Sequence, residues 1–266
     1  MNTLAAHTGT LQRKSVTDRD AWTVPVLEPS PDGLAERFAA GFGQHAILAF
    51  LIVLIGGLAV LVGLSYALGL LIVHVLVPIS PVGHANNHFE AWLAAHRTPD
   101  RTEASLIGSI MAGGVVLPIV VGVLGLVSAA SRHWRIAAFF VFSLLLESGA
   151  YRATTLVLHE HRPRVPRLEN LPVNASYPSG HTAASIAVYG GIVLLLTSKI
   201  KNAVFRAFAW TIAVAIPVFV ALSRMYRGMH HPLDVAGGAL LGIAALTVIV
   251  FACRSAGAAA EARSAR

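Results

Sequence analysis

Six long apolar runs with few charges limit what this chain can fold into more than any other feature of its sequence. A helix needs roughly 20 apolar residues to cross the hydrocarbon core of a bilayer. With 55% hydrophobic and 12% charged residues, the chain lies outside the usual range of soluble domains. The sequence therefore predicts an all-α integral membrane protein, a bundle of six transmembrane helices. The predicted spans are Ala46 to Val77, Ser105 to Ala130, Trp134 to Leu158, Gly180 to Ser198, Ala203 to Leu222 and Leu233 to Cys253.

The segments outside these spans predict one membrane domain with a tail at each end. Residues 1–45 are polar and contain no apolar core followed by a cleavage site, so we expect a largely flexible cytoplasmic tail. Residues 46–254 form the six-helix domain, and residues 255–266 form a short cytoplasmic tail. Between the first two spans, helical spacing predicts a short amphipathic helix at the membrane interface. Its marker residues are His88, Phe89, Trp92, Leu93 and His96.

Basic residues that flank the spans predict the orientation in the membrane. Cytoplasmic loops carry an excess of lysine and arginine. One side of the bundle holds the N-terminal tail together with Arg132, Arg135, Lys199, Lys201 and Arg206. We therefore expect a multi-pass protein of the cell membrane with both termini in the cytoplasm. The net charge of +7 is scattered at span ends and not interleaved with aromatic residues, which argues against nucleic-acid binding.

With six spans, three unusual segments meet on the extracytoplasmic side. They are the loop from His159 to Pro178, the helix entry Ser179-Gly180-His181, and the hairpin from Ser223 to Asp234. This side also carries arginines that break the positive-inside pattern. An anion-binding role explains these arginines better than topology does.

The first two segments offer groups suited to phosphate. Arg162, followed by Pro163, carries a planar donor fork that matches phosphate oxygens. The alternative for this pair is anchoring to lipid headgroups. Ser179 is a predicted helix N-cap, and the N–H groups of Gly180 and His181 then point beyond the helix end. His181 would lie where it could donate a proton to a leaving oxygen, although the segment could also be a plain cap.

The hairpin offers a nucleophile. His230 and Asp234 are four residues apart, so they face each other if the last span begins near His230. A carboxylate in that place would keep one imidazole nitrogen protonated and leave the other as a lone pair aimed at phosphorus. The alternative is that Asp234 only neutralises Arg224 or Arg227.

Together these motifs resemble the three-part signature of the type 2 phosphatidic acid phosphatase superfamily, which is related to the vanadium haloperoxidases. The resemblance covers roughly residues 134–253 and implies a six-helix bundle with an extracytoplasmic active site. It implies metal-independent dephosphorylation of a lipid phosphate or diphosphate, without a cofactor, through a phosphohistidine on His230. His181 would transfer protons and Asp234 would orient His230. The implied phosphate ligands are Arg162, Ser179, Gly180 and Arg224.

One position departs from the family pattern, and several readings stay open. Thr155 stands where the family usually has a lysine, seven positions before Arg162. Arg152, Arg164 or Arg167 could supply the missing charge. Among substrates we expect undecaprenyl diphosphate, slightly ahead of phosphatidic acid and phosphatidylglycerol phosphate. The alternatives are a lipid phosphotransferase and a catalytically silent lipid-binding protein.

The run His159-Glu160-His161 resembles a metal cluster in composition. Two histidines two positions apart on a helix point about 200° away from each other, so they do not easily share one ion. We therefore expect no metal in the site.

Overall fold

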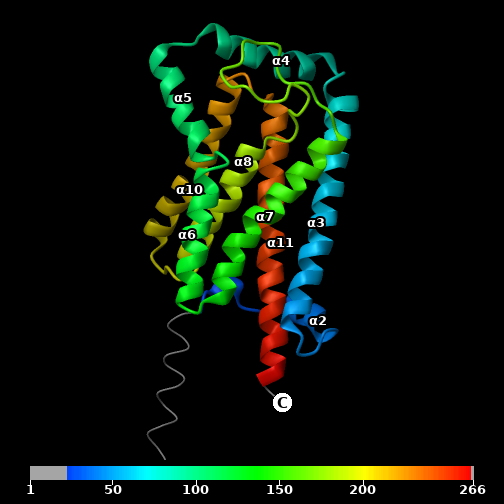
Figure 1. Cartoon of the computed structure of the whole chain (residues 1–266), viewed down its shortest axis with the longest axis vertical. Coiled ribbons are helices and arrows are strands. Elements are labelled where there is room, and N and C mark those ends of the chain that lie inside the picture. Colours follow the sequence, from blue (N-terminus) through cyan, green and yellow to red (C-terminus); the bar gives the residue numbers. More distant parts are fainter. Residues whose placement is uncertain (1–22, 265–266) are drawn as a thin grey trace, which may run out of the picture.

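The computed structural model describes residues 23–264, and within them every regular element is a helix (Figure 1). Six helical segments are long and apolar enough to cross a membrane, which confirms the predicted fold class. The first 22 residues of the predicted N-terminal tail and the last two residues lie outside the described part. In chain order the elements are η1 (Pro25–Leu27), α2 (Leu34–Ala40), α3 (Ala46–Leu71), η2 (Ile72–Leu76), α4 (Ser80–Ala95), α5 (Pro99–Met111), α6 (Val116–Ala130), α7 (Trp134–Val157), α8 (Gly180–Ser185), η3 (Ile186–Gly190), α9 (Gly191–Thr197), α10 (Ala203–Tyr226) and α11 (Pro232–Ser264).

The second span differs from the single run predicted from Ser105. It begins at Pro99 and consists of α5 and α6, separated by a break that contains Gly113 and Gly114. Glycine destabilises a helix interior, and Pro118 in the first turn of α6 has no N–H to bond to the preceding turn. The break exposes the carbonyl of Met111, which accepts a hydrogen bond of 2.7 Å from the hydroxyl of Tyr189.

Helix α11 lies at the centre of the bundle, where it contacts α3, α7 and α8 (Figure 1). Lipid tails are as apolar as the side chains, so helices in a membrane associate through close packing of small residues. Gly238 faces the carbonyl of Ser179, and Gly242 faces the carbonyl of Ala183; a Cβ at either glycine would collide with the backbone of α8 or its entry. These glycines therefore bring the start of α8 against the start of α11, where the site lies.

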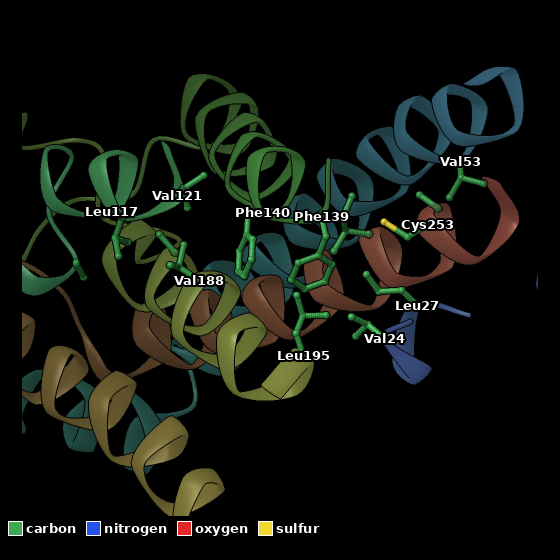
Figure 2. Close-up of a cluster of buried hydrophobic side chains, with 14 of the residues drawn as sticks. Val24, Leu27, Val53, Leu117, Val121, Phe139, Phe140, Val188, Leu195 and Cys253 are labelled. Atoms are coloured by element: carbon green, nitrogen blue, oxygen red, sulfur yellow. The ribbon is translucent and has the colours of Figure 1, made fainter. Parts of the chain in front are cut away.

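The main core is a cluster of large apolar side chains between α7, the fourth span and α11 (Figure 2). Phe139 and Val188 are fully buried in it, and the rings of Phe139 and Phe140 meet edge to face with centroids 5.5 Å apart. Close packing of this kind fixes the relative positions of the helices, because even a one-methylene change in volume is felt in a packed interior.

Residues 23–45 of the predicted flexible tail contain two helices that pack on the bundle. Leu27 is buried in the main core, and Ala39 of α2 packs beside Ala258 of α11. Glu28 pairs with Arg135 at 2.8 Å. Helix α11 also continues without a break through the predicted C-terminal tail as far as Ser264. Apolar residues of the N-terminal segment thus pack against the C-terminal part of α11. The positions of the apolar runs alone do not predict this contact.

Helix α4 occupies the predicted interfacial segment and lies across one end of the bundle (Figure 1). Its buried residues are Gly83, Asn86 and Glu90, whereas Trp92 is half exposed. The inner face is therefore polar, and Asn86 accepts a hydrogen bond of 3.1 Å from the N–H of Leu233 at the start of α11. Polar contacts thus dock α4 on the hairpin between α10 and α11.

Candidate active site

The hairpin between α10 and α11 presents His230 toward the interior of the bundle. Gly228 has a φ of +70°, a conformation that costs other residues energy. A Cβ at Gly228 would also lie 2.8 Å from the side chain of Val165. This tight turn ends α10 and places His230 two residues before α11, with its ring almost fully buried.

His230 is held by a backbone carbonyl. Its Nδ1 lies 2.8 Å from the carbonyl oxygen of Ser176, and the nearest Asp234 oxygen is 3.8 Å from the same nitrogen. A carbonyl oxygen only accepts hydrogen bonds, so Nδ1 carries the proton and Nε2 keeps its lone pair. Burial lowers the pKa of His230 to about 4, against the raising effect of Asp234, so the ring is neutral at pH 7.

The predicted pairing of His230 with Asp234 is therefore only partly what the structure contains. The two groups are close, but the carboxylate of Asp234 accepts hydrogen bonds from the hydroxyl of Ser176 and, at 2.8 Å, from the N–H of His231. His231 immediately precedes α11, so this second bond is the carboxylate half of a capping box. Asp234 thus acts on His230 through its charge and through Ser176, because α11 begins at Pro232 and not at His230.

His181 is the second residue of α8, and the charges of Arg224, His230 and Glu169 all act on it. The first N–H groups of a helix have no acceptor within the helix and suit an anion. Ser179 occupies the predicted N-cap position, but its hydroxyl lies 3.0 Å from that of Thr182 and caps no backbone N–H. Gly180 lies against Tyr151, whose ring would be 3.1 Å from an added Cβ.

Arg162 ties the long loop to the hairpin. Its Nε and Nη2 donate to the carbonyls of Pro172 and Ala175 at 2.7 and 2.8 Å, and its Nη1 donates to the carbonyl of Met229. Three of the five guanidinium N–H groups are thus used on backbone. The predicted phosphate ligand is therefore also the residue that holds Ser176 and His230 in register.

Arg224 is the most deeply buried charged side chain of the site, at 0% exposure. Its Nη1 donates to the hydroxyl of Ser109 and, at 2.7 Å, to Glu169. Its Nε and Nη2 have no hydrogen-bond partner among the described residues. Unpaired buried donors are rare in proteins, and two on one edge of a guanidinium match two oxygens of a phosphoryl group.

The sequence interpretation missed Glu169, Ser176 and Glu90. Glu169 is one of two acids in an arginine-rich loop, which is the only signal in the sequence that could have marked it. Ser176 and Glu90 carry no such signal, because their partners are 54 or more positions away in the chain.

The other predicted cations take different positions. Thr155, at the position of the family lysine, donates to the carbonyl of Arg152 at 2.9 Å. Arg152 and Arg164 are exposed. Arg167 is half-buried, donates from Nη1 to the carbonyl of Leu171, and its charge acts on Arg162. Among the residues with described side chains, no group of three histidine, cysteine or acidic side chains has metal-binding geometry.

His231 connects the site to α4. Its Nδ1 lies 2.6 Å from Oε1 of Glu90 and its Nε2 lies 3.3 Å from the carbonyl of His161. The contact with Glu90 lacks the alignment of a hydrogen bond, but at this distance it is an ion pair whenever the ring is protonated. Burial lowers the pKa of His231, but Glu90, Asp234 and Glu160 outweigh it and the pKa is raised above its usual value.

Replacing Glu90 with glutamine should loosen α4. We expect the variant to lose about 1–3 kcal/mol of stability at pH 6, because the imidazolium of His231 then lies buried without its carboxylate. The pKa of His231 is raised in the folded protein, so the contribution of the pair is complete below pH 6.5 and fades as the pH rises through the raised value. Thermal melting in detergent across this range measures the effect. A double-mutant cycle with His231→Gln that gives additive losses would contradict the coupling.

The fold and site together define a helical membrane protein with a buried, neutral histidine and a buried arginine that has two donor atoms without a partner among the described residues. Residues 136–256 match the family model of the PAP2 superfamily, so the chain carries a PAP2 region that contains all three motifs. The resemblance inferred from the motifs is confirmed.

Curated relatives include two phosphatases. The chain is 44% identical over 75 residues to an undecaprenyl-diphosphatase of Sulfolobus acidocaldarius, covering 28% of this chain and 32% of the relative. It is 35% identical over 105 residues to phosphatidylglycerophosphatase B of Bacillus subtilis, covering 38% and 51%. The chain thus spans only about a third to a half of the length of these relatives.

Two crystal structures share the fold. One is the transmembrane PAP2-type phosphatidylglycerolphosphate phosphatase from Bacillus subtilis, with a TM-score of 0.57 and 24% identity over 72% of this chain and 93% of that one. The other is LpxE of Aquifex aeolicus, with a TM-score of 0.50 and 22% identity over 62% and 94%. These likenesses confirm the arrangement of the helices.

Proposed function

We propose that this protein is a metal-independent lipid phosphatase that removes phosphate from a lipid phosphate or diphosphate through a phosphohistidine on His230. The observation that carries the proposal is the pair formed by a neutral histidine with a free Nε2 and an arginine with two unpaired buried donors. An enzyme that transfers a phosphoryl group through histidine needs both a nucleophilic lone pair and a cation for the phosphoryl oxygens.

In the first step, the Nε2 lone pair of His230 attacks phosphorus and the bond from phosphorus to the lipid oxygen breaks. Nδ1 keeps its proton, and the carbonyl of Ser176 and the charge of Asp234 stabilise the imidazolium that forms. His181 gives its proton to the leaving oxygen. Arg224 and the first N–H groups of α8, at Gly180 and His181, hold the phosphoryl oxygens beside Ser179 and Arg162.

In the second step, neutral His181 takes a proton from water, and the oxygen of that water attacks phosphorus. The N–P bond breaks, inorganic phosphate leaves, and its electron pair returns to Nε2 of His230. The proton that His181 gave to the product in the first step is thereby replaced. No metal is needed for either step, because arginine and backbone donors carry the charge stabilisation.

We infer that the active site faces the extracytoplasmic side. The hairpin, the long loop and α4 lie at one end of the bundle, and the described ends of the chain lie at the other (Figure 1). The basic residues that flank the spans, such as Arg132 and Lys199, are also at the other end. The positive-inside rule therefore supports a cytoplasmic position for both termini.

Undecaprenyl diphosphate is the substrate that we propose to test first. The relative with this activity in its name is 44% identical over 75 residues. Phosphatidylglycerol phosphate is the second substrate to test, because another relative is named a phosphatidylglycerophosphatase. A phosphotransferase would use the same first step and pass the phosphoryl group to a lipid hydroxyl. A silent lipid-binding protein would have no use for the free Nε2 of His230.

Phosphate release in the presence of EDTA tests the proposal. The purified protein is given undecaprenyl diphosphate, phosphatidylglycerol phosphate or phosphatidic acid in detergent, and we expect release from at least one with less than a twofold effect of EDTA. Lipid products are analysed with and without an acceptor alcohol, because a phosphotransferase produces a new phosphate ester in place of free phosphate. Loss of release in EDTA with recovery on adding a divalent cation would refute the metal-free mechanism.

A further inference from the structure

Glu169 lies between two arginines of the site. It belongs to the loop that joins α7 to α8, and its carboxylate contacts Arg224 at 2.7 Å through Oε2 and Arg227 through Oε1. The hydroxyl of Ser109 donates to Oε1 at 2.7 Å. Burial opposes the ionised form, but Arg224 and the hydrogen bonds outweigh it and lower the pKa of Glu169 to about 2. Glu169 is therefore a carboxylate at every pH at which the protein would work.

The guanidinium of Arg227 is fully used in hydrogen bonds to Glu169 and its neighbours, so none of its nitrogens is left for a ligand. Its Nε donates to Glu169, its Nη1 to the hydroxyl of Ser105 at 3.2 Å, and its Nη2 to the carbonyl of Leu168 at 3.2 Å. Every nitrogen of this guanidinium has a protein partner. The residue next to Glu169 is thus held as well, which fixes the loop against the end of α10.

Arg224 differs from Arg227 because one edge of its guanidinium, formed by Nε and Nη2, has no protein partner in the described part of the chain. Only its Nη1 contacts protein groups, namely Glu169 and Ser109, while its Nε and Nη2 have no partner among the described residues. A guanidinium is planar, so a bond that fixes Nη1 also fixes the direction of the opposite edge. The contacts of Glu169 therefore determine where the two free donors of Arg224 point.

We propose that Glu169 is a positioning residue, which anchors Arg224 through Nη1 so that its Nε and Nη2 face the phosphoryl group. This inference rests on the proposed function. Glu169 makes no described contact with His230. Its hydrogen bond to Nη1 of Arg224 is its direct link to the proposed phosphate ligand, and its charge also acts on His181. Because Arg224 has two donors in reserve, a phosphate can bind without displacing the carboxylate.

Binding of inorganic phosphate tests this role without any turnover. Affinity is measured by calorimetry in detergent for the whole chain and for Glu169→Gln, which keeps the size of the side chain but loses its charge. We expect at least tenfold weaker phosphate binding, and in lipid assays a rise in KM larger than the fall in kcat. Glu169→Asp keeps the charge with a shorter reach and should recover part of the affinity. Glu103→Gln, on the exposed side of α5, is the matched control and should bind as the parent does.

Any of the following results would overturn the positioning role. Equal phosphate affinity in folded Glu169→Gln would make Glu169 a purely structural residue, and tighter binding would make it an anion that competes with substrate. If Glu169→Gln does not fold, Arg227→Lys takes its place, because it removes one anchor of Glu169, and an unchanged affinity there would have the same meaning. Absence of phosphate binding by a parent protein that still releases phosphate from lipid refutes this inference alone. Absence of both binding and release refutes the proposed function as well.

Discussion

Replacing His230 with glutamine should reduce phosphate release from lipid at least about a thousandfold, because loss of the nucleophile removes the covalent route. Glutamine retains an N–H for the carbonyl of Ser176, so the loop and hairpin should stay in place. The expected loss is therefore in kcat, with little change in the thermal melting point. Steady-state release of phosphate in EDTA measures the effect.

Trapping the phosphorylated intermediate provides a second test of the His230→Gln variant. Rapid quenching of the parent protein with labelled substrate should give label attached to protein, stable in alkali and lost in acid, as expected for a nitrogen–phosphorus bond. Label should be absent from the His230→Gln protein and present in His88→Gln, which changes an exposed histidine on α4. Retention of both release and label in His230→Gln would show that a different group attacks phosphorus.

The second large effect is expected at Arg224. Arg224→Lys should lower kcat/KM by about 100-fold, since removal of one preorganised donor to a developing charge typically costs 10²–10³-fold. Lysine keeps the positive charge, but its ammonium cannot bind Glu169 on one side and two phosphoryl oxygens on the other. The loss therefore tests the two-sided geometry of the guanidinium and not its charge.

The controls for Arg224 follow from its burial. Arg206→Lys changes an exposed arginine at the other end of α10 and should leave kcat/KM within twofold. The Lys variant should also melt at a lower temperature, because a lysine in this buried place leaves Glu169 less well paired. An Arg224→Lys protein with the kcat/KM of the parent would refute the assignment of Arg224 as the phosphate ligand.

The acid limb of the pH profile provides a further check on His230. Its pKa is lowered by burial to about 4, so the neutral nucleophile persists well below pH 6. The folded state binds this proton less readily than the unfolded chain, so stability falls as the pH drops below about 6.5, the ordinary histidine value. Activity limited by His230 should thus decline only near pH 4. This lies below the pH range in which His231 loses its proton and its ion pair with Glu90 weakens.

Much of the fold follows from the distribution of apolar residues along the chain. A backbone that crosses lipid must satisfy all of its N–H and C=O groups within the segment, so six apolar runs can only become six helices. Parity then brings the ends of spans three to six together, and for this reason the residues His181, His230 and Asp234 share one end of the bundle. The break between α5 and α6 was not predicted, because the two glycines there sit inside an otherwise apolar run.

Residue spacing in the sequence predicts only part of the site. The distance of four residues from His230 to Asp234 correctly places them together, but Nδ1 donates its hydrogen bond to the carbonyl of Ser176, which is 54 positions away. Likewise, Arg224 and Glu169 are 55 positions apart in the chain. No periodicity links such residues, and they come into contact only because Arg162 and Arg227 dock the loop on the hairpin and the end of α10.

The sequence by itself therefore determined the class of the protein, the number of its membrane spans and the identity of the candidate site residues. These properties depend on composition and on contacts within one or two turns of a helix. The tertiary structure alone decided which partner each reactive group has: the carbonyl of Ser176 for His230, Glu169 for Arg224 and Glu90 for His231. Those pairings depend on how the long loop and α4 pack against the hairpin, and packing between distant segments is set by the shape of the whole bundle.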